Sequence, residues 1–302
     1  MTTRVETAGA AGARVRVIKA AAGRGSVAGV GLVLAGTVSV QFGSAVAALL
    51  FPRAGALGVV ALRIAIAAVL LLVVCRPRLR GYTRQDWAVV ACFGVALGCM
   101  NMLFYQSIDR IPLGPAVTLE VLGPLALSVI AARRALSLVW AGLALAGVFL
   151  LGQGGFGELN LAGAGYALGA GAMWAAYIVF NSRAGARFPR LDGLAIAMAV
   201  AALISLPLGV ASSGSVLLEP GVLGLGLAVA LLSSGLPYTL ELLALRRLPA
   251  ATFAVLMSLA PGLAAAAGWL ILGQTLSLVQ CLAIALVVVA SAGAVRTGRR
   301  GA

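Results

Sequence analysis

The sequence predicts an all-helical integral membrane protein with ten transmembrane helices, arranged as two five-helix repeats of opposite orientation. Apolar residues make up 62% of the 302 positions and charged residues only 10%. The apolar residues fall into ten runs, and Lys and Arg alternate between the joints that separate them. Because a soluble domain carries roughly 25% charged residues, we expect lipid to be the solvent for most of this chain.

Each predicted helix is an apolar run close to the roughly 20 residues that cross the hydrocarbon core. The runs cover residues 27–50, 57–75, 87–108, 112–132, 136–153, 161–182, 193–212, 221–244, 249–271 and 276–295. The first run is too long for a signal peptide, and no small-residue cleavage site follows it. We therefore expect a disordered cytoplasmic tail at 1–26, repeats at 27–153 and 161–295, and a second cytoplasmic tail at 296–302.

The distribution of Lys and Arg predicts the orientation, because positively charged loops remain in the cytoplasm. With the N-terminus inside, 19 of the 22 Lys and Arg residues fall on the cytoplasmic side. Arg53 and Arg110 fall on the opposite side, and Arg63 lies within a run. We therefore expect a multi-pass protein of a bacterial-type inner (plasma) membrane with both termini in the cytoplasm.

Two proline motifs predict the internal repeat. Arg110-Ile-Pro112 matches Arg247-Leu-Pro249, and Leu122-Gly-Pro124 matches Leu259-Ala-Pro261, in both cases 137 positions further along the chain. The first Pro of each copy opens a helix, and the second lies inside one, where it interrupts the backbone hydrogen bonds. Because five helices per repeat is an odd number, the second copy must be inverted in the membrane. Inverted repeats are typical of alternating-access transporters.

Composition also argues against several classes of function. The net charge is +14, but the arginines punctuate apolar runs and form no patch with aromatic residues, so we expect no nucleic-acid binding. Histidine is absent, which removes the commonest metal ligand and every His-dependent catalytic site. Cys75, Cys92, Cys99 and Cys281 show no CxxC spacing and mostly lie inside runs, so we expect buried thiols and no metal or cofactor.

Two of the eight acidic residues, Glu120 and Glu241, are embedded in apolar runs. A carboxylate inside a membrane is costly, so it points to function by default. Glu241 has an alternative explanation, because it lies near the inner end of its run and could pair with Arg246 or Arg247. Glu120 has no such neighbour in the sequence.

Polar residues of four runs fall at one depth. At about 1.5 Å per residue, Glu120 lies roughly 12 Å and Arg63 roughly 9 Å from the outer ends of their helices. Gln41, Ser44 and Asn101 fall in the same band. We therefore predict an outer-midplane cavity in which Arg63 and Glu120 form a pair or bind the two ends of an amino-acid-like zwitterion. The planar fork of Arg63 suits a carboxylate, and Glu120 suits an ammonium group or a proton.

Aromatic and glycine residues give weaker indications. The candidates for cavity walls are Tyr105, Trp174, Tyr177 and Tyr238. Anchoring at the membrane interface or ordinary packing explains each of them as well. Gly94-xxx-Gly98 and Gly165-xxx-Gly169 predict faces on which two helices approach closely.

Several longer motifs extend through both halves of the chain. They are Gln41-Phe-Gly-Ser44, Ala61-Leu-Arg63, Phe104-Tyr105, Arg110-Ile-Pro-Leu-Gly-Pro-Ala-Val117, Leu119-Glu120, Leu122-Gly-Pro-Leu125, Leu236-Pro-Tyr-Thr-Leu-Glu-Leu-Leu-Ala-Leu-Arg-Arg-Leu248 and Leu256-Met-Ser-Leu259. Together they resemble the EamA family of the drug/metabolite transporter superfamily, and within it the threonine/homoserine exporter-like branch. The resemblance covers nearly all of residues 27–295. It implies a ten-helix inverted-repeat fold and proton-driven export of small amino acids and related metabolites.

Two positions depart from the family pattern. Ala260 stands where the family usually has Glu in a Leu-Met-Ser-Leu-Glu-Pro segment, and Gln274 stands where it usually has the Glu of Leu-Gly-Glu. Their loss concentrates any coupling role on Glu120 and Glu241. Export of another class of metabolite, an intramembrane enzyme that uses the two carboxylates and a non-catalytic scaffold are the alternatives. We expect a transporter, a monomer or homodimer, that moves an amino-acid-like solute, with protons as the candidate coupling ion.

Overall fold

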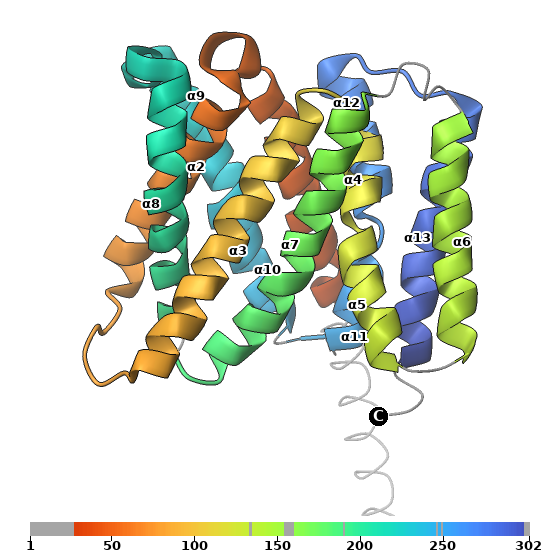
Figure 1. Cartoon of the computed structure of the whole chain (residues 1–302), viewed down its shortest axis with the longest axis horizontal. Helices are drawn as coiled ribbons and strands as arrows, with labels where there is room; N and C mark the ends of the chain where they lie inside the picture. The colour runs from red at the N-terminus through yellow and green to blue at the C-terminus, as the bar shows by residue number, and fades with distance from the viewer. Residues whose placement is uncertain are drawn as a thin grey trace, which may run out of the picture.

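The computed structural model describes residues 27–132, 135–153, 160–189, 191–245, 247–248 and 250–298. These residues form helices joined by short turns, and no strand occurs among them. The helices lie side by side and run along one common direction (Figure 1). They are a first helix (Val27–Ala48), α2 (Phe51–Cys75), α3 (Arg84–Ile108), α4 (Leu113–Glu120), α5 (Leu122–Ala132), α6 (Ala135–Gln153), α7 (Leu161–Gly185), α8 (Asp192–Ser213), α9 (Pro220–Ala230), α10 (Leu236–Leu245), α11 (Ala250–Met257), α12 (Ala260–Leu272) and α13 (Leu278–Gly298).

Seven helical segments of the described chain are long and apolar enough to cross a membrane. They are Val27–Ala48, Phe51–Cys75, Arg84–Ile108, Leu161–Gly185, Asp192–Leu218, Val255–Leu272 and Leu278–Arg296. The three remaining predicted runs overlap three shorter apolar helices, Leu113–Leu127, Leu138–Leu150 and Pro220–Gly235. The fold is that of a multi-pass membrane protein, and the count of ten crossings stays a prediction.

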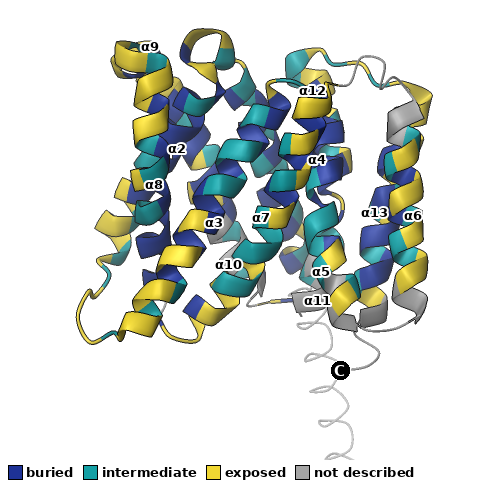
Figure 2. Cartoon of the chain, viewed as in Figure 1, coloured by how far each residue is buried: buried dark blue, intermediate teal, exposed yellow. Residues whose placement is uncertain are grey.

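Large apolar side chains cover the outside of the helix bundle. Leu203 is 72% exposed, Phe149 66% and Trp269 62%. Figure 2 shows exposed residues along outer helices such as α6 and α8, with buried residues where helices face one another. Such a surface is unfavourable in water but ordinary in lipid. The cysteines are free, as expected, but Cys92 and Cys281 lie on this surface, so the prediction of buried thiols is wrong for them.

The main helix pairs are α2 with α8, α3 with α7, α6 with α13 and α3 with α8. Gly94 and Gly98 allow the last of these contacts: a Cβ on Gly94 would stand 2.5 Å from the Cβ of Val200, and one on Gly98 would stand 3.2 Å from the Cα of Ala201. The prediction of a close-packed face is therefore confirmed for this pair. It is wrong for Gly165, because a Cβ there would meet no atom within 4 Å, while one on Gly169 would make only an ordinary contact with Leu103, 3.4 Å from its Cδ1.

Prolines interrupt two of the predicted helices, as expected. The run 112–132 divides into α4, which ends at Glu120, and α5, which begins just before Pro124. The run 249–271 divides in the same way into α11 and α12, immediately before Pro261. Because Pro124 has no N–H, the carbonyl of Glu120 cannot receive the usual hydrogen bond from four residues further on.

The start of α3 is fixed by its cap. The Thr83 hydroxyl accepts the backbone N–H of Asp86, and the Asp86 carboxylate accepts the Thr83 N–H at 2.9 Å, which is a capping box. The same carboxylate binds Arg187, just beyond the end of α7, at 2.8 Å. This contact ties together the two helices that carry Asn101, Tyr105 and Trp174.

Candidate functional site

Arg63 is a buried cation in the middle of α2, only 7% exposed. Its Nη1 donates to the Tyr105 hydroxyl at 2.9 Å, and its Nη2 donates to Asn101 Oδ1 at 2.7 Å. Asn101 and Tyr105 are four residues apart on α3, so they lie on one face of that helix, one turn apart. The structure therefore brings three of the predicted site residues into one hydrogen-bonded cluster.

Neighbouring groups fix the orientation of Asn101 and Tyr105 in this cluster. Asn101 Nδ2 donates to the Leu97 carbonyl at 2.8 Å, which turns its Oδ1 toward the guanidinium. The Tyr105 ring is fully buried, and the Arg63 Cζ lies 5.3 Å from its centroid. Phe51 packs against the same ring at a centroid distance of 5.8 Å. Asn101 and Tyr105 orient the guanidinium, but neither of them supplies negative charge.

Glu120 is an acidic group whose charge interacts with that of Arg63. It is the last residue of α4 and is partly buried. Its backbone lies against α7, since a Cβ on Gly171 would stand 2.5 Å from the Glu120 carbonyl oxygen. Gly123 also packs against the backbone of Gly171, so α7 crosses the break between α4 and α5 with no side chain between them. This crossing places the backbone of Glu120 directly against α7.

Trp174 and Tyr177 lie on α7, partly buried against the main core. Trp174 is three residues from Gly171, so it shares the face of α7 that crosses the α4–α5 break. The Tyr177 ring packs on Phe93 at a centroid distance of 5.3 Å. This contact fits ordinary packing, which was the alternative explanation for Tyr177.

Gln41 and Ser44 are buried on the first helix, at 6% and 1% exposure. The Ser44 hydroxyl donates to its own helix, at the Val40 carbonyl, 3.0 Å away. Gln41 Oε1 is buried and accepts no hydrogen bond within the described residues. Among those residues, no hydrogen bond joins either side chain to the Arg63 cluster. The structure confirms that both are buried but not that they contact Arg63.

The remaining two candidates come from the second half of the chain. The backbone of α10 carries Tyr238 and Glu241, but their side chains lie outside the described residues. Arg246, the neighbour considered for Glu241, lies outside them as well. The assignments of Tyr238 and Glu241 to the site stay predictions.

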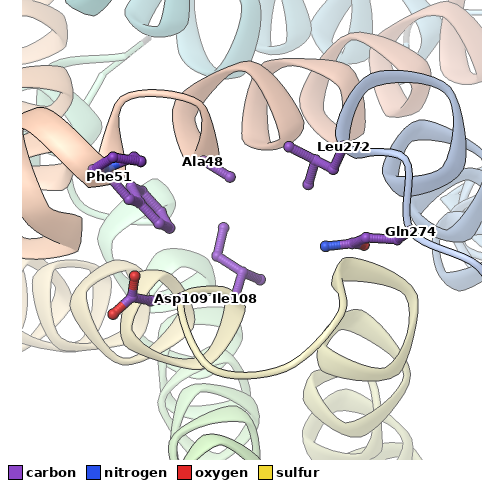
Figure 3. Close-up of a pocket in the computed structure, with 7 residues that line it drawn as sticks. Ala48, Phe51, Ile108, Asp109, Leu272 and Gln274 are labelled. Atoms are coloured by element: carbon purple, nitrogen blue, oxygen red, sulfur yellow. The ribbon is translucent and has the colours of Figure 1, made fainter.

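A cavity of about 340 Å³ opens where four helix ends meet. It is lined by Ala48, Phe51, Pro52, Ile108, Asp109, Leu272 and Gln274. In Figure 3, Phe51 and Asp109 lie on one side, and Leu272 and Gln274 lie opposite them. Among the predicted site residues whose side chains the structure describes, none lines it. Phe51 nevertheless connects it to the site, because the ring of Phe51 packs on Tyr105, and Tyr105 holds Arg63.

The two positions that depart from the family pattern have different surroundings. Ala260 is 2% exposed at the start of α12, inside the main core. Gln274 follows α12, and its Oε1 accepts the backbone N–H of Leu113 at 3.0 Å. Sequence reasoning treated Gln274 as a lost carboxylate and missed that an amide oxygen makes this contact. No local signal connects positions 113 and 274, which are far apart in the chain.

Sequence reasoning also missed a π-helical turn, Leu231–Gly235, between α9 and α10. Ser233 and Ser234 are buried in it, and Ser39 of the first helix donates to the Leu232 carbonyl at 2.6 Å. Such turns are rare and frequently occur at functional sites. The turn places the first helix directly against the second half of the chain.

A bundle of apolar helices around a buried, oriented arginine defines a multi-pass membrane protein with a polar site in its interior. The EamA-like transporter family model matches residues 161–296. The threonine/homoserine exporter RhtA of Escherichia coli (strain K12) is 44% identical over 271 residues, which cover 89% of this chain and 92% of the relative. The exporter of the same name from Salmonella typhimurium (strain LT2) is 44% identical over 264 residues, covering 87% and 89%. The chain belongs to the EamA-like transporter family.

A protein of known crystal structure, 19% identical, superposes with a TM-score of 0.61 over 92% of this chain and 98% of its own. At that identity, the likeness supports the fold alone. Family membership confirms the resemblance identified from the motifs and the prediction of a transporter, not an enzyme.

Proposed function

We propose that the protein is an inner-membrane secondary transporter that exports threonine, homoserine and related amino acids. The relatives that bear this activity in their names match nine-tenths of the chain. The observation that carries the proposal is the Arg63 cluster, which holds a guanidinium in one orientation inside the bundle through two side chains of α3. A planar guanidinium is the cation best matched to the carboxylate that all amino acids share.

Glu120 supplies the complementary end of the site. Glu120 belongs to a different helix from Arg63, and its carboxylate interacts electrostatically with the Arg63 guanidinium. In our proposal an amino acid binds with its carboxylate at Arg63 and its ammonium group at Glu120. The same carboxylate takes up a proton when the substrate leaves, which couples export to the proton gradient. The Glu120 carboxylate thus binds either the substrate ammonium group or a proton, as the exchange of substrate for protons requires.

The transport cycle we propose is alternating access between two inverted five-helix repeats, with ten crossings in all and both termini in the cytoplasm. The helix bounds support this arrangement, because α11 (Ala250–Met257) begins and ends 137 positions after α4 (Leu113–Glu120). The end of α10 follows the end of α3 by the same interval. Both broken helices resume just before a proline, so the two copies share their local geometry as well as their motifs.

Ligand-dependent stability tests the substrate class. The full-length protein, purified in detergent, is heated with a panel of amino acids at concentrations far above their dissociation constants. A ligand at about 100 times its Kd stabilises the folded state by about 2.7 kcal/mol. We expect threonine and homoserine to raise the melting temperature by several degrees, and Arg63→Ala to remove that rise. A rise with sugars or apolar cations but with no amino acid would contradict the proposed substrate class.

A further inference from the structure

The side chain of Gln274 makes a hydrogen bond that joins the two halves of the chain. Gln274 follows Gly273, which ends α12 in the left-handed conformation (φ 63°). Its backbone N–H donates to the Gly268 carbonyl at 3.1 Å, and a Cβ on Gly268 would contact the Gln274 side chain. The side chain is therefore held along α12, with its Oε1 3.0 Å from the backbone nitrogen of Leu113.

Leu113 is the first residue of α4, and Glu120 is the last. The first N–H groups of a helix have no partner within it, and Pro112 provides no side-chain cap. Gln274 supplies the missing acceptor from the other half of the molecule. Because α4 is eight residues long, it spans about 12 Å. A short rigid helix transmits a displacement of its first residue to its last.

The surroundings reinforce this connection. Gly114 lies against α12, where a Cβ would stand 3.0 Å from the Cβ of Ala265, so the two helices are in close contact beside the hydrogen bond. Gln274 also lines the 340 Å³ cavity, facing Phe51 and Asp109 (Figure 3). The contact thus lies at the edge of the cavity, at the end of α4 away from Glu120.

We propose that Gln274 is a positioning residue for Glu120: its side-chain oxygen holds the start of α4 against the second half of the chain and so sets the place of the Glu120 carboxylate. The inference rests on the role of Glu120 in the proposed function. This role requires an acceptor oxygen at position 274 but does not depend on whether the side chain is charged. A glutamine and a glutamate therefore serve alike at this position.

The test uses the full chain in proteoliposomes with four variants. Gln274→Met keeps the side-chain length but removes the oxygen, and Gln274→Glu restores an acceptor. The matched control is Gln280→Met, because Gln280 Oε1 also accepts a backbone N–H, from Ser277 at 2.9 Å, but within the second half of the chain alone. Gln274→Lys, which places a donor against the Leu113 N–H, repeats the test should the Met variant not be recovered.

Two readouts separate positioning from stability. The first is the rate at which a hydrophobic carbodiimide labels Glu120, followed by peptide mass spectrometry, which needs no substrate. The second is threonine turnover per molecule of purified protein, with KM. The loss of one hydrogen bond changes an equilibrium constant about fivefold. Gln274→Met should therefore raise the rate of labelling at Glu120 at least about threefold. It should lower turnover about fivefold, with KM within about twofold of wild type.

We expect Gln274→Glu to restore both readouts and Gln280→Met to leave both unchanged. Any of three results would overturn the role of Gln274. The Gln274→Met variant could be labelled at Glu120 at the wild-type rate, or Gln280→Met could raise the labelling rate by the same factor. Gln274→Glu could also fail to return the labelling rate to that of the wild type. Absence of threonine transport by the wild-type protein would instead contradict the proposed function, and labelling would still decide the role of Gln274.

Discussion

Replacement of Arg63 by lysine keeps the positive charge and removes the fork. In the structure, Nη1 and Nη2 reach two different residues of α3, Tyr105 at 2.9 Å and Asn101 at 2.7 Å. A lysine ammonium is a single point charge on a flexible stem and cannot reproduce this spacing. The variant therefore loses at least one of the two bonds and cannot present two parallel N–H groups to a carboxylate.

The size of the effect follows from the kind of bond that is lost. A hydrogen bond that involves a charged group contributes about 1.5–3 kcal/mol. At 1.36 kcal/mol for each factor of ten, the Arg63→Lys variant should lose about 10- to 150-fold in kcat/KM for threonine. Tyr105→Phe removes one bond and leaves the guanidinium, so its loss should be smaller than that of Arg63→Lys.

The assay is uptake of labelled threonine by proteoliposomes that contain equal amounts of folded protein, measured over a range of concentrations. Arg53→Lys is the matched control, because Arg53 lies on the same helix but is exposed. We expect its kcat/KM to stay within about twofold of wild type. An Arg63→Lys variant that transports as well as the Arg53→Lys control would refute the carboxylate-binding role of Arg63.

Three further predictions address the other parts of the molecule. Glu120→Gln should reduce threonine flux at least tenfold while membrane levels stay normal, since the amide binds neither a proton nor an ammonium group in the same way; undiminished flux would exclude Glu120 from coupling. Gly94→Val should lower the melting temperature by several degrees, because overpacking costs about 1–3 kcal/mol, whereas Gly165→Val should change it little; equal shifts would contradict the packing described. Single cysteines at positions 110 and 247, in a cysteine-free background, should react with a membrane-impermeant maleimide from opposite faces; reaction from one face would contradict the inverted repeat.

Sequence reasoning predicted the helices well because membrane-spanning length and proline placement are local properties. It predicted that the helices are interrupted near Pro124 and Pro261. A proline lacks the backbone N–H in any surroundings, so this effect can be read from the sequence alone. It also selected Arg63, Asn101 and Tyr105, because a polar residue inside an apolar run is conspicuous.

The contacts between helices were harder to predict, and the physical reason is symmetry around the helix axis. A helix that is apolar on all sides gives no sign of which face meets a neighbour. Depth alone therefore placed Arg63, Glu120 and Asn101 at one level, but it could not predict that the Arg63 guanidinium donates to Asn101 and Tyr105. Gly94-xxx-Gly98 and Gly165-xxx-Gly169 have the same spacing, yet only the first faces a helix closely. The contact of Gln274 with Leu113 depends on folding alone.

The most direct test of amino-acid export is flux in sealed proteoliposomes with an imposed pH gradient. Labelled threonine is placed on the side that corresponds to the cytoplasm, and its movement is followed with and without the gradient. We predict that threonine and homoserine cross faster when protons flow in the opposite direction, and that Glu120→Gln vesicles lose this acceleration. The proposed activity would be contradicted if the protein is correctly folded and every amino acid in the panel still crosses no faster than in protein-free vesicles.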